Sequence, residues 1–156
     1  MVDASFYPFA SSHEDLIILT ERSEARLGWS AAVALKDGFV FFAVKDAVAL
    51  PQTVLWMSNG GRDYPPWNGR HRAVIGIEEA ATGIHLDASS TEARPGIPLA
   101  TGRTARIAYA FGAIAVPDGW SRIADIALAG NTLVLTDAGG GTRALPFRGE
   151  HFDQTR

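Results

Sequence analysis

Short runs of strand-forming residues, separated by turn residues, extend along almost the whole chain. β-branched and aromatic residues recur in these runs, and most prolines lie between them. The runs that predict strands are residues 15–21, 25–35, 38–44, 53–58, 72–78, 83–87, 104–111, 123–129, 132–136 and 143–147. Asp37-Gly38 and Gly130-Asn131 predict hairpin turns. Many short strands joined by turns indicate an antiparallel sandwich or barrel, and we expect an all-β antiparallel β-sandwich.

Length and composition narrow the class of protein. With 156 residues, 47% of them hydrophobic and 20% charged, the chain is most simply one soluble domain, residues 1–156. The net charge of -3 predicts no general attraction to nucleic acid or to anionic membranes. The lack of cysteine excludes disulfides and thiol nucleophiles. Without an apolar run of membrane-spanning length or a basic leader, we expect a cytoplasmic protein.

The segment from Val54 to Glu79 differs from the rest of the chain in its chemistry. It combines tryptophan, tyrosine, arginine, histidine, asparagine and glutamate in one loop-and-strand unit. Glycines and two consecutive prolines stiffen the loop around Trp67, which is how a scaffold presents a binding site. Flat aromatic surfaces, forked donors and carboxylates are the groups that hold a polyhydroxylated ligand. The alternative is a structural loop in which Trp67 closes one end of the core.

Glu78 is the candidate catalytic residue of this segment. It closes the expected strand 72–78, and period two places Arg72, Val74, Gly76 and Glu78 on one face, with His71 on the opposite face. Gly76 leaves space beside Glu78 for a ligand ring. A carboxylate at a strand end beside arginine can act as a general base, although a structural salt bridge to Arg72 or Arg62 is the more common use. Residues 78–82 also carry a weak signal for one helical turn.

The run from Asn59 to Gly83, NGGRDYPPWNGRHRAVIGIEEAATG, resembles the C-terminal half of aldose-1-epimerase-like proteins, the galactose-mutarotase-like superfamily. Gly76-Ile77-Glu78 matches a strand end whose glutamate is the catalytic base in true mutarotases. The proline-bearing loop 94–99 and the Gly102-Arg103-Thr104 strand start also fit, so the resemblance covers roughly residues 50–115. It implies a partial supersandwich and a base that removes the proton of an anomeric hydroxyl.

The chain departs from that family in two respects. Mutarotase-like chains are about twice as long as a single domain of this size. Their catalytic histidines lie upstream of the glutamate, and His13, His71 and His85 do not reproduce that pattern. The resemblance therefore implies half a supersandwich, either a shortened protein or a homo-oligomer that rebuilds the missing surface. No acid partner for Glu78 is assigned.

The expected ligand is a sugar or related polyol, bound without a cofactor or metal. Trp67 would stack on a sugar face, Asn59 and the arginines would hydrogen-bond hydroxyls, and Glu78 would accept a proton or a hydroxyl bond. The substrate-binding candidates are Asn59, Arg62, Trp67, His71 and Arg72. The alternative from a different class is a non-catalytic interaction domain that forms a homo-oligomer, such as a homodimer, through the loop of aromatic residues around Trp67.

Overall fold

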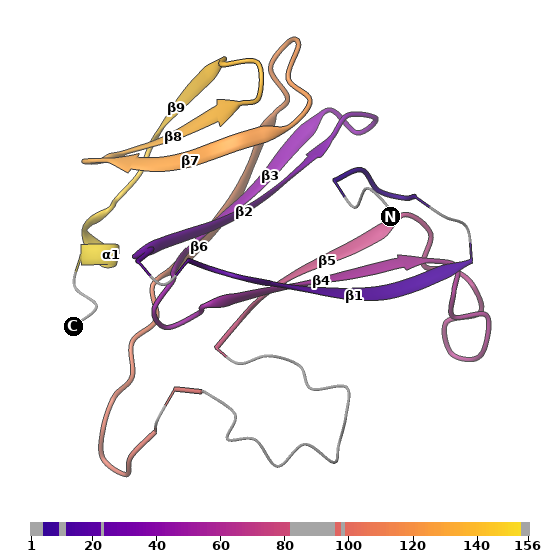
Figure 1. Cartoon of the computed structure of the whole chain (residues 1–156), viewed down its shortest axis with the longest axis horizontal. Helices are drawn as coiled ribbons and strands as arrows, with labels where there is room; N and C mark the ends of the chain where they lie inside the picture. Colours follow the sequence, from indigo (N-terminus) through magenta and orange to yellow (C-terminus); the bar gives the residue numbers. More distant parts are fainter. Residues whose placement is uncertain (1–4, 10–11, 23, 82–95, 98, 154–156) are drawn as a thin grey trace. The chain divides into compact units, whose positions relative to one another are not determined.

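The computed structural model describes residues 5–9, 12–22, 24–81, 96–97 and 99–153. In this part of the chain the structure has nine β-strands and one four-residue helix, α1 (Glu150–Asp153). The strands form three antiparallel sheets of three strands each (Figure 1). This confirms the predicted all-β class with antiparallel pairing. The predicted strand 83–87 lies outside the described residues.

The chain divides into two compact units, each built from two segments of sequence. Unit 1 consists of Met1–Glu21 and Pro51–Gly96, and unit 2 of Arg22–Leu50 and Ile97–Arg156. The expectation that residues 1–156 form one domain stays a prediction.

Unit 1 contains one sheet, in the order β1-β4-β5 (Figure 1). Its strands are β1 (His13–Thr20), β4 (Gln52–Asn59) and β5 (Val74–Ala80). The central strand β4 is the most buried: Val54 and Met57 are each 1% exposed, and Ser58 is fully buried. β1 and β4 are far apart in sequence but are hydrogen-bonded neighbours in the sheet, and their register places Glu14 directly opposite Ser58.

Unit 2 contains two sheets that share one hydrophobic core. One sheet has the order β2-β3-β6, and the other has the order β7-β8-β9. The strands are β2 (Leu27–Ala34), β3 (Phe39–Asp46), β6 (Tyr109–Ala115), β7 (Ile123–Ala129), β8 (Thr132–Asp137) and β9 (Thr142–Pro146). The core joins Val40, Phe42 and Val44 of β3 to buried side chains of β7 and β8, among them Leu133 and Leu135. This is the sandwich arrangement that the sequence predicts.

The core of unit 2 follows the alternation of its strands. Every second residue of β3 and β8 is buried in this core, as a period of two requires. In β7 the buried residues are instead Ile123 and Ile126, three apart. A register shift between Ile123 and Asp125 explains this spacing, because the extra residue brings both isoleucines to the same face.

Three sequence-based expectations need correction. The strand expected at 72–78 is β5, which begins at Val74, because Ala73 has a positive φ of 52° and interrupts the extended backbone. The strand expected at 104–111 is β6, which begins at Tyr109, where pairing with Lys45 of β3 starts. No helical turn forms at Glu78, since β5 continues to Ala80.

Candidate functional site

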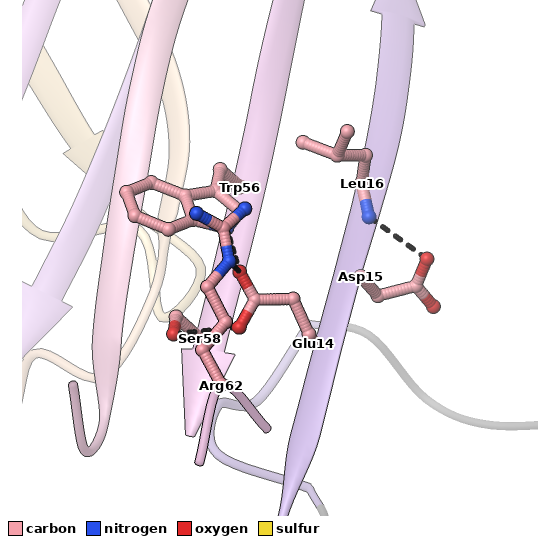
Figure 2. A network of polar contacts seen from close by, with 6 residues as sticks. All are labelled: Glu14, Asp15, Leu16, Trp56, Ser58 and Arg62. Carbon is pink, nitrogen blue, oxygen red and sulfur yellow. Dashed lines mark hydrogen bonds and ion pairs between the residues drawn. The ribbon is translucent and has the colours of Figure 1, made fainter. Parts of the chain in front are cut away.

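A carboxylate from β1 holds together the polar cluster of unit 1 (Figure 2). Glu14 accepts hydrogen bonds from Trp56 Nε1 at 2.6 Å and from Ser58 Oγ at 3.0 Å. Arg62 Nε lies 2.6 Å from the same Glu14 oxygen that accepts the indole bond. The register explains the contacts: Glu14 faces Ser58 directly across β1 and β4, and Trp56 lies two residues further along the same face.

Arg62 lies between two tryptophans. Its guanidinium carbon is 5.0 Å from the centroid of the Trp56 ring and 4.8 Å from that of Trp67. Both distances are within the range of a cation–π interaction. Figure 2 shows the guanidinium lying across the Trp56 indole while the carboxylate of Glu14 reaches it from the neighbouring strand. The arginine is therefore fixed in position by a charge partner and by two flat rings.

The connection from β4 to β5, residues 60–73, brings Arg62 to this place, and we call it the aromatic loop. Its ends are joined by a 2.6 Å hydrogen bond from Gly60 N to His71 O. Gly61 passes so close to β1 that a Cβ there would be 2.7 Å from the backbone carbon of His13 and 2.8 Å from the nitrogen of Glu14. Only glycine allows this approach, which sets Arg62 beside Glu14.

Gly76 allows Trp56 and Glu78 to approach each other on one face of the sheet. It is paired with Trp56 across β4 and β5, so the indole lies next to a residue without a side chain. A Cβ at Gly76 would be 3.4 Å from Trp56 Cε3 and 3.2 Å from Glu78 Oε1. Trp56 and Glu78 therefore lie on one face of the sheet and both approach Gly76 so closely that even a methyl group there would be crowded, and the room expected for a ligand ring is not present over Gly76 itself.

An open depression of about 440 Å³ occupies this face. It is lined by Glu14, Asp15, Leu16, Trp56, Arg62 and Glu78. Glu14 is engaged with three donors, whereas Glu78 is exposed and makes no ion pair or side-chain hydrogen bond within the described residues. The depression thus offers a guanidinium, an indole and an uncommitted carboxylate to a ligand.

Tyr7 extends the cluster at the N-terminal side. Its hydroxyl is buried and has no hydrogen-bond partner among the described residues. Burial, and secondly the negative charge of Glu14, raise the pKa of Tyr7 above its ordinary value of 10.0. The phenol therefore stays protonated at neutral pH and remains a donor beside the carboxylate.

The structure brings only some of the predicted site residues to the depression. Glu78 and Arg62 line it, and Trp67 lies behind Arg62. The predicted salt bridge between Arg62 and Glu78 is not formed, because Arg62 pairs with Glu14. Asn59 accepts a hydrogen bond from Ala73 N at 3.0 Å and so contributes to closing the aromatic loop.

The positions of Arg72 and His71 differ from those that strand alternation predicts. Arg72 precedes β5, and its guanidinium lies about 4 Å from where Gly60 and Gly69 would carry a Cβ, over the loop itself. Arg72 therefore lies outside β5, and the strand alternation that predicts it on the Glu78 face does not apply to it. His71 was placed on the opposite face, but its ring lies edge-on against Trp56 with centroids 5.7 Å apart. The positive φ of Ala73 breaks the alternation in both cases.

Glu14, Trp56 and Ser58 are not among the site residues predicted from the sequence. Trp56 belonged to an expected strand, and Glu14 preceded another, but their proximity depends on the pairing of β1 with β4. The only local signal was a glutamate at the start of an apolar run. Within the described residues, no group of three histidine, aspartate or glutamate side chains is arranged to hold a metal ion. No described helix is long and apolar enough to cross a membrane.

No protein-family model, no curated protein and no solved structure matches this chain.

Proposed function

We propose that the depression of unit 1 binds a carbohydrate or a related polyol. The observation that supports this most directly is Arg62, held between Trp56 and Trp67 at the rim of a depression that also contains Glu78. A sugar hydroxyl both donates and accepts hydrogen bonds, so its site needs both kinds of partner. Arg62 supplies the donors and Glu78 an acceptor.

The donors of Arg62 are not exhausted by its ion pair. Its contact with Glu14 uses Nε, and in the described part of the chain its terminal nitrogens make no hydrogen bond. They are directed by the stacking of the guanidinium on Trp56. A neutral polyol can accept from both nitrogens without displacing Glu14, which favours hydroxyl recognition over binding of a second carboxylate beside two existing ones.

Catalysis is the further step of this proposal. The sequence Gly76-Ile77-Glu78, which lies within β5 and not at its end as expected, resembles a motif of the mutarotase-like superfamily in which the glutamate is the base. Glu78 would remove the proton of the anomeric hydroxyl while an acid, which is not assigned, protonates the ring oxygen. The bond between the anomeric carbon and the ring oxygen then breaks, and the ring closes again on the other face of the aldehyde with the two proton transfers reversed.

The binding test uses two neighbouring glutamates. Glu79 follows Glu78 on the same strand but accepts a 2.6 Å hydrogen bond from Thr53 Oγ1 on the other face. Titration of isotope-labelled protein with D-galactose, D-glucose and D-xylose should shift the Trp56 indole signal with a millimolar dissociation constant. We expect Glu78→Gln to weaken binding about 3- to 10-fold, because the remaining amide carbonyl accepts a weaker, uncharged hydrogen bond. Glu79→Gln should leave it unchanged.

Mutarotation of freshly dissolved α-anomers, followed by polarimetry, tests catalysis separately. If Glu78 is a general base, Glu78→Gln should lower the rate about 100-fold or more, and Glu79→Gln should not. Sugar binding without any rate above background would end the catalytic part of the proposal and leave the binding part. The absence of both would end the whole proposal.

One observation favours the interaction domain as a second candidate. Tyr64, at the tip of the aromatic loop, is 53% exposed although its ring contacts Trp67. An exposed aromatic on a stiff loop is a common element of a homo-oligomer interface. Sedimentation of the wild type and of Tyr64→Ala tests this candidate. An oligomer that dissociates in the variant supports an interface at this loop, and a monomeric wild type excludes it.

A further inference from the structure

A second cavity, of about 500 Å³, lies within unit 2 and belongs to a different chemical class. Three basic side chains line it: Arg106, Arg148 and His151. Three aromatic side chains do so as well: Tyr109, Phe147 and Phe152. No acidic residue is among its lining residues, in contrast to the depression of unit 1.

The aromatic part of this cavity is anchored to the core. Phe147 and Phe152 pack against the hydrophobic core of unit 2, and their ring centroids are 5.7 Å apart. The backbone of Phe147 is fixed by a 2.9 Å hydrogen bond from its nitrogen to Asn131 O. A Cβ at Gly149 would be 2.8 Å from Leu128 Cδ2, so the backbone after Phe147 lies directly on β7.

The lining segment before and at the start of β6 is fixed through β3. Ala108 is buried and its carbonyl accepts a 2.9 Å hydrogen bond from Asp46 N, which aligns the start of β6. Tyr109 follows at the first position of that strand and is 42% exposed. The cavity is therefore formed by two anchored backbone segments and does not require a large rearrangement to accept a small ligand.

The basic side chains of this cavity are not neutralised by the protein. Within the described part of the chain, neither Arg106, Arg148 nor His151 makes an ion pair or a side-chain hydrogen bond. Two guanidinium groups in a cavity that is also lined by phenylalanine rings are complementary to an anion attached to an apolar body. Arginine in particular matches the planar geometry of a carboxylate.

We propose that unit 2 carries a binding site for a small carboxylate with an apolar or aromatic body, formed by Arg106 and Arg148 over Phe147 and Phe152. The apolar body lies on the two phenylalanines and the carboxylate faces the arginines. The site is independent of the proposed sugar site, because all of its lining residues belong to unit 2. A neutral sugar offers neither the charge nor the apolar surface that this cavity recognises.

A charge-matched series of probes tests the proposal on the full-length protein. 4-Phenylbutyrate, 4-phenylbutyramide and 4-phenylbutylamine have the same apolar body with a negative, neutral and positive end. Acetate has the negative end alone. In NMR titrations, we expect 4-phenylbutyrate to bind about 10-fold more tightly than the amide and to shift the backbone signals of Ala108, Phe147 and Phe152. The amine and acetate should bind more weakly still.

Substitution of the arginines provides the second arm. Arg106→Gln with Arg148→Gln should weaken binding of 4-phenylbutyrate about 10-fold and leave that of the amide unchanged. Arg143→Gln, an exposed arginine of β9 outside the cavity, is the matched control. Equal affinity for the acid and the amide, or shifts confined to other residues, would overturn the proposal. So would unchanged affinity in the double variant.

Discussion

Replacement of Glu14 by glutamine tests the polar cluster of unit 1 directly. The substitution preserves the size of the side chain but removes the charge and one of the two acceptor oxygens. The wild-type carboxylate accepts hydrogen bonds from the Trp56 indole and the Ser58 hydroxyl, and it forms an ion pair with the Arg62 guanidinium. A glutamine amide offers one carbonyl to these three donors, and its NH₂ group would oppose one of them.

The expected loss follows from these contacts. A hydrogen bond to a charged acceptor contributes about 1.5–3 kcal/mol, and the Trp56 and Ser58 donors make two of them. Glutamine retains one at the lower strength of a neutral bond. The ion pair adds less than about 1 kcal/mol, because the Arg62 and Glu14 side chains are 32% and 24% exposed. We therefore expect Glu14→Gln to lower the free energy of unfolding of unit 1 by about 2–6 kcal/mol.

Urea unfolding followed through residue-resolved amide signals of unit 1 measures this loss. Hydrogen exchange of the Trp56 indole N–H is the local readout and should accelerate in the variant. Asp15→Asn is the matched control, since the Asp15 side chain is 55% exposed and its Oδ1 accepts only a 2.8 Å bond from Leu16 N. If both variants unfold within about 0.5 kcal/mol of each other and the indole exchange is unchanged, Glu14 does not stabilise unit 1 through these contacts.

Two further predictions concern the backbone. Gly61→Ala should destabilise unit 1 by about 1–3 kcal/mol in urea unfolding, because its Cβ would meet the backbone of His13 at 2.7 Å. Gly96→Ala, with nothing within 4 Å, is the control, and equal stability of the two variants would contradict the contact. Asp137 has a pKa below its usual 3.8, primarily because Gly139 N donates to its carboxylate. Its contribution to the stability of unit 2 is complete above pH 3.8 and is lost as the pH falls through the lowered pKa. Asp137→Asn should therefore reduce stability at neutral pH and flatten the acid limb of the stability profile, and an unaltered acid limb would exclude this role.

Much of the fold was predictable where the determinants are local. The strands flanking Asp37-Gly38 and Gly130-Asn131 are β2, β3, β7 and β8, and they lie within two residues of their predicted positions. In each case a turn with a positive-φ glycine connects two runs of β-formers, so a few neighbouring residues determine the structure. Strand β6 was misplaced, because its start depends on pairing with β3.

The candidate site was predictable only in part for the same reason. Glu78 and Arg62 were found from their chemistry within one segment, and both line the depression. Glu14 reaches them through the register of β1 on β4, which no local pattern encodes. The positions of His71 and Arg72 could not be predicted by strand alternation, because Ala73 has a positive φ that interrupts the strand. A positive φ is uncommon for alanine, so the sequence does not indicate it.

The interleaving of the two units has a consequence for synthesis on the ribosome. β1 emerges first, but its partner β4 follows only after the β2–β3 hairpin of unit 2. The hairpin pairs residues close in sequence and can form at once, whereas His13 must wait for Asn59. During that interval the apolar run Leu16–Leu19 lacks its β4 partner and resembles an open sheet edge. The nascent chain is thus most exposed to association with other chains before the first residue of the aromatic loop has been made.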